Sequence, residues 1–227
     1  MIKTNYKKNK LQIITFIILG ALPLFMDSYY LDNISYFMCW TFISLGLAVI
    51  WGMGGILSFG QTAFFGLAGY GFSVISINFL GVAGVSLWSI ALALILTGIF
   101  GLIVGYFLFY GGIYDVFVGI VTLAITLVFE TFMQQTAGPE YAIGKARLNG
   151  FNGMQGMPTI GFESIPFGLV EGVTQYYFML ILALITLVGL YKFKSSKMGL
   201  IFLASKEDRE RVSSLGHNVQ KIQLIAF

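Results

Sequence analysis

The longest uncharged stretch of the chain decides what it can fold into. No Asp, Glu, Lys, Arg or His occurs in the 82 residues from Asn33 to Tyr114. A water-soluble fold cannot solvate such a stretch, whereas about 20 apolar residues suffice to cross the hydrocarbon core of a bilayer as a helix. Helices are expected because unpaired backbone amides are too costly in lipid, and the sequence lacks the strict alternation of a barrel strand. The sequence therefore predicts an all-α membrane protein.

Apolar segments alternate with short polar turns along the chain. They cover residues 11–26, 34–51, 55–79, 85–110, 116–135 and 173–191. The last six residues, Ile222–Phe227, are mainly apolar but too short to span, so we expect them to begin a further helix. The prediction is a single transmembrane domain over residues 1–227, a polytopic helical bundle of about six complete transmembrane helices plus the start of a seventh, truncated at the C-terminus.

The lysines and arginines predict the orientation of these spans. Eleven of the thirteen lie before the first apolar segment or between Lys192 and Lys221, and the other two, Lys145 and Arg147, lie in the loop 136–172. Six crossings put the two basic regions on the same side, which the positive-inside rule assigns to the cytoplasm. We therefore expect a cytoplasmic N-terminus and an external loop at 136–172.

A glycine-rich stretch, Trp51–Tyr70, carries the polar residues Ser58, Gln61 and Thr62 at membrane depth. Two explanations stay open. Glycines permit close packing of neighbouring helices, and they also permit a broken helix whose freed backbone groups line a pathway. Under the second explanation, Ser58, Gln61 and Thr62 are candidate pathway residues.

Glu130 is the one carboxylate placed well inside an apolar segment. Ionisable groups at this depth are costly and commonly face a cavity or a partner, so Glu130 is also a candidate pathway residue. Because Gln134 and Gln135 follow within about one helical turn, a side chain that reaches the outer membrane surface is equally consistent with the pattern. If Glu130 carries a proton instead, the chain is an ion-coupled secondary transporter.

The segment 198–215 has the pattern of a short amphipathic helix between two spans. Its apolar residues fall mainly on one face, and its polar block is expected to rest at the membrane surface or to dock a soluble partner. The candidate docking residues are Lys206, Glu207, Asp208, Arg209 and Glu210.

An enzyme active site is not indicated. With one histidine, His217, and one cysteine, Cys39, the chain lacks paired ligands for a membrane haem or a zinc ion. We expect no cofactor and no catalysis within this chain, and we read Cys39 as a packing residue.

The chain carries four motifs, in Trp51–Tyr70, Gly112–Ala124, Gly150–Pro158 and Leu215–Phe227. Together they resemble those of the LivM-like permease subunits of branched-chain amino acid ABC importers. Trp51–Tyr70 is similar to the family signature W-G-x-x-G-x-L-S-F-G-Q/H-x-x-F-F-x-x-G-x-Y. Gly112-Ile113-Tyr114 with Val121-Thr122-Leu123-Ala124 resembles the G-I-Y…V-T-L-A hairpin, although extra residues intervene here. Gly150–Pro158 resembles G-x-N-G-x-x-G-x-P, and Leu215–Phe227 resembles L-G-x-N-V…L-x-A-F.

The resemblance implies a function. Such a permease forms half of the translocation pathway for branched-chain amino acids, urea or short amides in a bacterial inner membrane. Its expected partners are a second, LivH-like permease, two cytoplasmic ATPase subunits and a periplasmic substrate-binding protein. In that assembly the segment 198–215 is expected to be the coupling helix that contacts an ATPase, and ATP hydrolysis belongs to the partner subunits.

Overall fold

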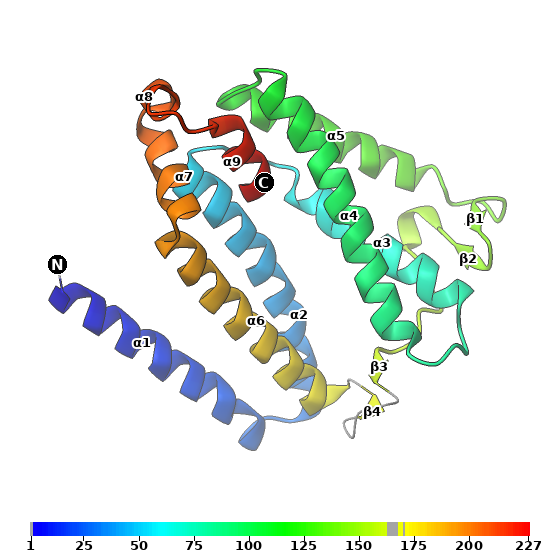
Figure 1. The fold of residues 1–227 in the computed structure, drawn as a ribbon. Helices are drawn as coiled ribbons and strands as arrows, with labels where there is room; N and C mark the ends of the chain where they lie inside the picture. Colours follow the sequence, from blue (N-terminus) through cyan, green and yellow to red (C-terminus); the bar gives the residue numbers. More distant parts are fainter. Residues whose placement is uncertain (1, 163–167, 170) are drawn as a thin grey trace.

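The computed structural model describes residues 2–162, 168–169 and 171–227, which form a helical bundle with two small hairpins (Figure 1). The long helices are α1 (Ile2–Ala21), α2 (Ser28–Leu47), α3 (Gln61–Asn78), α4 (Val85–Tyr110), α5 (Val116–Gln134) and α6 (Gly172–Ser195). Shorter helices complete the chain: α7 (Lys197–Glu207), α8 (Arg209–Ser214) and α9 (Val219–Ala226). The predicted all-α polytopic class is therefore confirmed.

Length and hydropathy separate the long helices into two groups. Among the described residues, four helices are long and apolar enough to cross a membrane, namely Ser28–Met53, Val85–Tyr110, Val116–Gln134 and Gly172–Ser195. The apolar part of the first segment, Ile13–Leu24, is shorter, and α3, which begins at Gln61 and ends at Asn78, is not among the candidate spans. The total of six crossings stays a prediction.

Side-chain caps and glycines set several helix ends. Asp208 and Asn218 accept hydrogen bonds at 2.9 Å from the backbone amides of Arg211 and Lys221, at the starts of α8 and α9. These bonds satisfy amides that have no partner within the helix. Gly112, with φ of 78°, allows the tight turn between α4 and α5.

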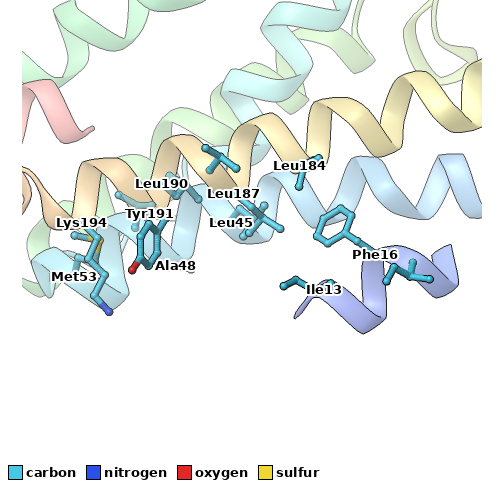
Figure 2. A pocket seen from close by; sticks show the side chains of 13 residues that line it. Ile13, Phe16, Leu45, Ala48, Met53, Leu184, Leu187, Leu190, Tyr191 and Lys194 are labelled. Carbon is cyan, nitrogen blue, oxygen red and sulfur yellow. The ribbon is translucent and has the colours of Figure 1, made fainter. Parts of the chain in front are cut away.

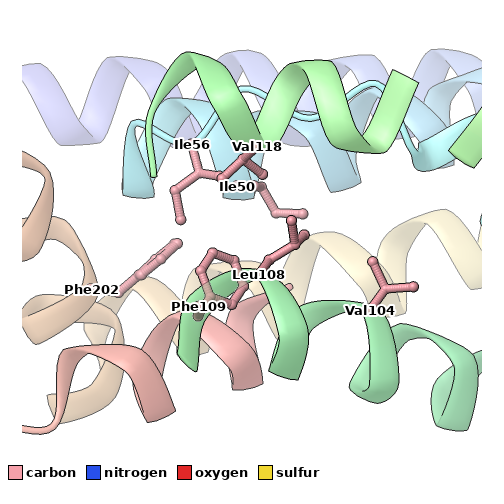
Figure 3. Close-up of a cluster of buried hydrophobic side chains, with 7 residues drawn as sticks. All are labelled: Ile50, Ile56, Val104, Leu108, Phe109, Val118 and Phe202. Atoms are coloured by element: carbon pink, nitrogen blue, oxygen red, sulfur yellow. The ribbon is translucent and has the colours of Figure 1, made fainter. Parts of the chain in front are cut away.

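The main hydrophobic core lies where residues 48–56, which follow α2, meet α4, α5 and α7 (Figure 3). Phe202 from α7 is completely buried there and packs with Ile50, Phe109 and Val118. Gly105 of α4 leaves room for α9, since a Cβ at this position would lie 2.8 Å from Leu224. The shared core fixes the short helices α7 and α9 to the membrane-length helices.

A second, smaller core joins α1, α2 and α6 through Leu31, Tyr176 and Leu180. The Tyr176 hydroxyl donates to the carbonyl oxygen of Leu19 at 2.7 Å, in the last turn of α1. That bond satisfies one of the carbonyl groups that a helix end leaves without a partner.

The segment between α5 and α6 is mostly irregular. Its hairpins are β1 (Ala142–Ile143) with β2 (Ala146–Arg147) and β3 (Gly161–Phe162) with β4 (Gly168–Leu169), each antiparallel. In Figure 1 the second hairpin lies at the end of the bundle opposite α7 and α8. This arrangement agrees with the expected separation of loop 136–172 from the segment 198–215.

Two of the predicted helices are shortened or interrupted in the structure. The segment 55–79 is helical only from Gln61, because residues 55–60 are non-helical. The segment 198–215 is not one helix, because Asp208 leaves the helical conformation (φ −155°, ψ 98°) and starts a new helix as its N-cap.

Candidate functional site

The glycine-rich stretch forms a break between α2 and α3. The end of α2 continues as a π-helix over Ala48–Met53, Gly55 adopts a left-handed conformation with φ of 71°, and the chain stays non-helical as far as Gly60. Both features that the sequence left open are present, because the helix is interrupted at residues 55–60 and Gly54 packs closely against Phe202 of α7. Non-helical backbone at membrane depth is tolerated only where its polar groups are satisfied by the protein or face water.

Helix α5 satisfies part of the broken backbone. The Phe59 amide donates to Thr122 Oγ1 at 3.0 Å, and the Thr126 hydroxyl donates to the Phe59 carbonyl oxygen at 3.0 Å. Gly119 of α5 also lies next to the break, since a Cβ built there would be in ordinary van der Waals contact, at 3.5 Å, with the Leu57 carbonyl oxygen. Side chains of a distant helix thus replace the lost helical hydrogen bonds.

Ser58 is a structural part of the break. Its side chain is buried and its hydroxyl oxygen accepts the Gly60 amide at 3.2 Å. Gln61 is half-buried at the start of α3, and Thr62 is exposed. The chain therefore brings the three predicted residues together, with Ser58 bound to its own loop and the other two more accessible.

Glu130 lies on the same face of α5 as the two threonines, because residues 122, 126 and 130 are each separated by four positions. It is exposed and accepts a hydrogen bond at 3.1 Å from Gln134. No side-chain contact in the described part joins it to Ser58, Gln61 or Thr62. Its role in transport stays a prediction.

Helix α7 contacts the break directly. The aromatic ring of Phe202 packs so closely on Gly54 that a Cβ there would collide with it. Lys206 donates from Nζ to the Gly52 carbonyl oxygen at 3.1 Å, and its aliphatic chain covers Gly55. The segment predicted to dock a partner is therefore joined to the candidate pathway by one apolar contact and one charged hydrogen bond.

The predicted docking residues divide by role. Asp208 caps α8 and pairs with Arg211 at 3.4 Å, and Arg209 lies over the ring of Tyr114, 3.5 Å from its centroid. Burial lowers the pKa of Arg209, and the nearby Tyr114 and Asp115 offset part of this effect. Lys206 is bound to the break, so Glu207 and Glu210, both exposed, are the members available to a partner.

Sequence reasoning missed a polar seam between α3 and α4. It consists of buried serines at positions 73, 76, 86 and 89. Ser73 donates to Met157 Sδ at 2.7 Å, and the Gly161 amide donates to Ser86 at 3.1 Å, so the seam ties the loop 136–172 to the bundle. The signal in the sequence is a pair of serines three residues apart on each helix, which places both on one face.

Two hollows accompany these elements. The larger, about 720 Å³, is an apolar groove between α1, α2 and α6, with Tyr191 and Lys194 at one end and Phe16 toward the other (Figure 2). It contains none of the candidate residues. The smaller, about 210 Å³, lies between the break, the α4–α5 turn, the α7–α8 junction and α9. The charged and polar side chains gather at the smaller hollow.

Residues 29–227 match the family described as branched-chain amino acid transport system / permease component. The chain belongs to this family, and the predicted resemblance to LivM-like permeases is confirmed. No curated protein and no solved structure matches the chain significantly.

Proposed function

We propose that this permease component is one of two membrane subunits in an ATP-binding-cassette importer for branched-chain amino acids or related small amides. Its partners are a LivH-like permease, two cytoplasmic ATPase subunits and a periplasmic substrate-binding protein. The assembly lies in a bacterial inner membrane, with the N-terminus and α7–α8 cytoplasmic. The family match supports the transport role, and the basic residues support the orientation.

The family match carries the transport role, and the contact between Phe202 and Gly54 is the observation that supports the coupling step. An ATPase that moves α7 displaces the Phe202 ring against the break, and the bond from Lys206 to Gly52 moves with it. Packed cores respond to such displacement by switching between discrete arrangements, which suits alternating access. Ser58, Gln61, Thr62 and Glu130 are the proposed pathway residues next to the element that switches.

Gly54→Ala tests the contact, with Gly52→Ala as a matched control. The added methyl group at position 54 collides with the far end of the Phe202 ring, whereas a Cβ at position 52 meets nothing within 4 Å. We expect Gly54→Ala to lower ATP-dependent uptake about tenfold, which corresponds to about 1.4 kcal/mol, and Gly52→Ala to leave it within twofold. Uptake is measured in proteoliposomes containing the complete importer.

Phe202→Leu in the Gly54→Ala background separates coupling from misfolding. Leucine lacks the ring atoms that the new methyl group meets, so the double variant should recover part of the uptake. If Gly54→Ala transports normally, or if the second substitution restores nothing while both variants insert and assemble, the coupling path is wrong.

Charge reversal at Glu207 and Glu210 tests the docking role. Both carboxylates are exposed and are not used in the internal contacts of Asp208 and Arg209. We expect that most of the ATPase no longer co-purifies with a variant that carries both Glu207→Lys and Glu210→Lys, while its membrane insertion stays normal. The control Glu140→Lys, in the loop 136–172, should still co-purify with the ATPase. Retention of the ATPase by the double variant would place the docking surface elsewhere.

An ion-coupled secondary transporter with Glu130 as the proton carrier makes the opposite prediction for energy supply. Uptake would then stop when the proton gradient is collapsed and would be indifferent to an ATPase inactivated in its own nucleotide site. The proposed importer predicts the reverse for both treatments.

A further inference from the structure

The large groove between α1, α2 and α6 takes no part in the proposed transport pathway. Its volume is about 720 Å³, and its lining residues come from all three helices. Figure 2 shows Lys194 and Tyr191 at one end of the groove and Leu184 and Phe16 toward the other. The groove therefore runs along the helices, with a charged side chain at one end.

Hydrogen bonds join α1 to α6 beyond the Phe16 end of the groove. The Tyr176 and Tyr177 hydroxyls donate to the carbonyl oxygens of Leu19 and Gly20, at 2.7 and 3.1 Å. These bonds lie at the start of α6, next to the loop 136–172. They do not reach the other end of the groove, since Lys194 lies about 27 Å further along the helix at 1.5 Å per residue.

The length of the groove matches one leaflet of a bilayer. Leu184 lies near the middle of α6 and Lys194 in its last turn. The ten residues between these positions rise about 15 Å. The hydrocarbon core is about 30 Å thick, so one leaflet contributes about 15 Å. A phospholipid acyl chain ends at the midplane, whereas a transmembrane helix continues through both leaflets, so the length favours a lipid.

The width of the groove favours the same occupant. A helix about 10–12 Å across and 15 Å long needs roughly 1,200 Å³ or more, which exceeds the volume of the groove. Sites for small ligands commonly have about 300–1,000 Å³ and mainly apolar walls. Here the wall consists largely of aliphatic side chains, among them Leu45, Val49 and Val188.

The charged end of the groove suits an anionic headgroup. Lys194 is the one charged side chain among the described lining residues, and in the described part of the chain no carboxylate pairs with it. Tyr191 lies three positions earlier on the same helix face, where its hydroxyl is a further donor. Lys192 and Lys197, both exposed, add positive charge nearby. Basic pockets between transmembrane helices bind anionic lipid headgroups on the cytoplasmic side, where the proposed orientation puts Lys194.

We propose that the groove binds one phospholipid with an anionic headgroup, such as phosphatidylglycerol, from the cytoplasmic leaflet. The phosphate lies beside Lys194 and the Tyr191 hydroxyl, and one acyl chain follows the groove toward Leu184. The lipid joins α1 to α2 and α6 in the leaflet that the tyrosine hydrogen bonds do not reach. The site depends on the proposed orientation, and on neither the ATPase nor the transported substrate.

Photocrosslinking of a lipid to the complete importer in mixed micelles tests the site. The probe is phosphatidylglycerol with a diazirine in its acyl chain, and mass spectrometry identifies the crosslinked peptides. We expect crosslinks to residues of the groove, and unlabelled phosphatidylglycerol should compete at least fivefold more strongly than phosphatidylcholine. Equal competition by the two lipids would overturn the proposal. Groove crosslinks that form in the isolated subunit but not in the complete importer would show that a partner subunit covers the groove, which also overturns it.

Matched variants on α6 locate the headgroup and the acyl chain. Lys194→Gln should reduce the groove crosslinks at least fivefold, whereas Lys194→Arg, which keeps the charge, and Lys192→Gln, which lies outside the groove, should stay within twofold. Val188→Trp fills the groove and should reduce the crosslinks with either headgroup, whereas Ile185→Trp, exposed outside the lining, should not. Unchanged crosslinking in Lys194→Gln overturns the proposed headgroup site. Co-purification with the partner subunits checks that each variant is folded.

Two results on the same preparation separate the lipid site from the proposed function. ATP-dependent uptake without headgroup-selective crosslinks in the groove overturns the lipid site alone. Selective crosslinks in the groove without ATP-dependent uptake overturn the proposed function alone.

Discussion

The two hydrophobic cores of this molecule are built differently. The core around α1, α2 and α6 consists of apolar side chains beside an open groove, and its cross-helix hydrogen bonds come from the tyrosines at the start of α6. The core around Phe202 is next to a broken helix whose backbone depends on Thr122 and Thr126 of another helix. In lipid, the first kind of packing needs only complementary shape, whereas the second needs specific partners at fixed positions.

This difference indicates which core can take part in the conformational change proposed for transport. A helix with all its backbone hydrogen bonds intact moves as a rigid body, whereas a break can exchange one set of side-chain partners for another. The charged segment α7–α8 is attached to the broken region through Phe202 and Lys206. We therefore assign switching to the Phe202 core and anchoring in the membrane to the α1–α2–α6 core.

The largest expected contrast comes from removing one large side chain from each core. Phe202→Ala should destabilise the protein by about 3–5 kcal/mol, because the ring is completely buried among protein atoms. Leu180→Ala should cost less, since Leu180 is smaller and lies beside α1, where detergent or lipid can fill the space. Unfolding in mixed micelles, followed by circular dichroism, measures both. Equal losses in the free energy of unfolding would show that both side chains are enclosed by protein atoms to the same extent.

A smaller contrast comes from the same substitution in the two regions. Thr122→Val removes the acceptor of the Phe59 amide and should cost about 1–2 kcal/mol. Thr186→Val removes an exposed hydroxyl that donates to the Leu182 carbonyl oxygen of its own helix, so the change should stay within about 0.5 kcal/mol. We also expect only Thr122→Val to reduce uptake. If Thr186→Val is as harmful, the break has no special dependence on its side-chain partners.

The contrast also explains which parts of the fold were predictable. The boundaries of α4 agree with the predicted segment 85–110, and those of α5 differ by one residue from 116–135, because hydropathy and the flanking turns define intact helices. Helix α6 extends past the predicted end at Tyr191 to Ser195. The charges of Lys192 and Lys194 placed the predicted end of the helix before them. However, long cationic side chains can reach the membrane surface from the last turn of a helix.

The broken region was less predictable for a physical reason. The glycines of Trp51–Tyr70 were consistent with either close helix packing or a helix break. The non-helical backbone at Phe59 is stabilised by Thr122 and Thr126, which lie more than sixty residues further along the chain. The interruption at Asp208 was missed, although an aspartate followed by a new helical turn is a common N-cap. The candidate residues Gln61, Thr62 and Glu130 remain predictions, since their role depends on partners that a single sequence does not specify.

The smallest expected effect is a loss of stability without a loss of transport. Tyr176→Phe keeps the buried ring and removes only the hydrogen bond to the Leu19 carbonyl oxygen, so we expect a cost of about 0.5–1.5 kcal/mol. Tyr177→Phe is the matched control, because its longer bond of 3.1 Å to the Gly20 carbonyl oxygen is exposed and should contribute less. Uptake should remain within twofold in both variants. If Tyr176→Phe reduces uptake as strongly as Thr122→Val, then the α1–α2–α6 core takes part in switching, and the division between an anchoring core and a switching core is wrong.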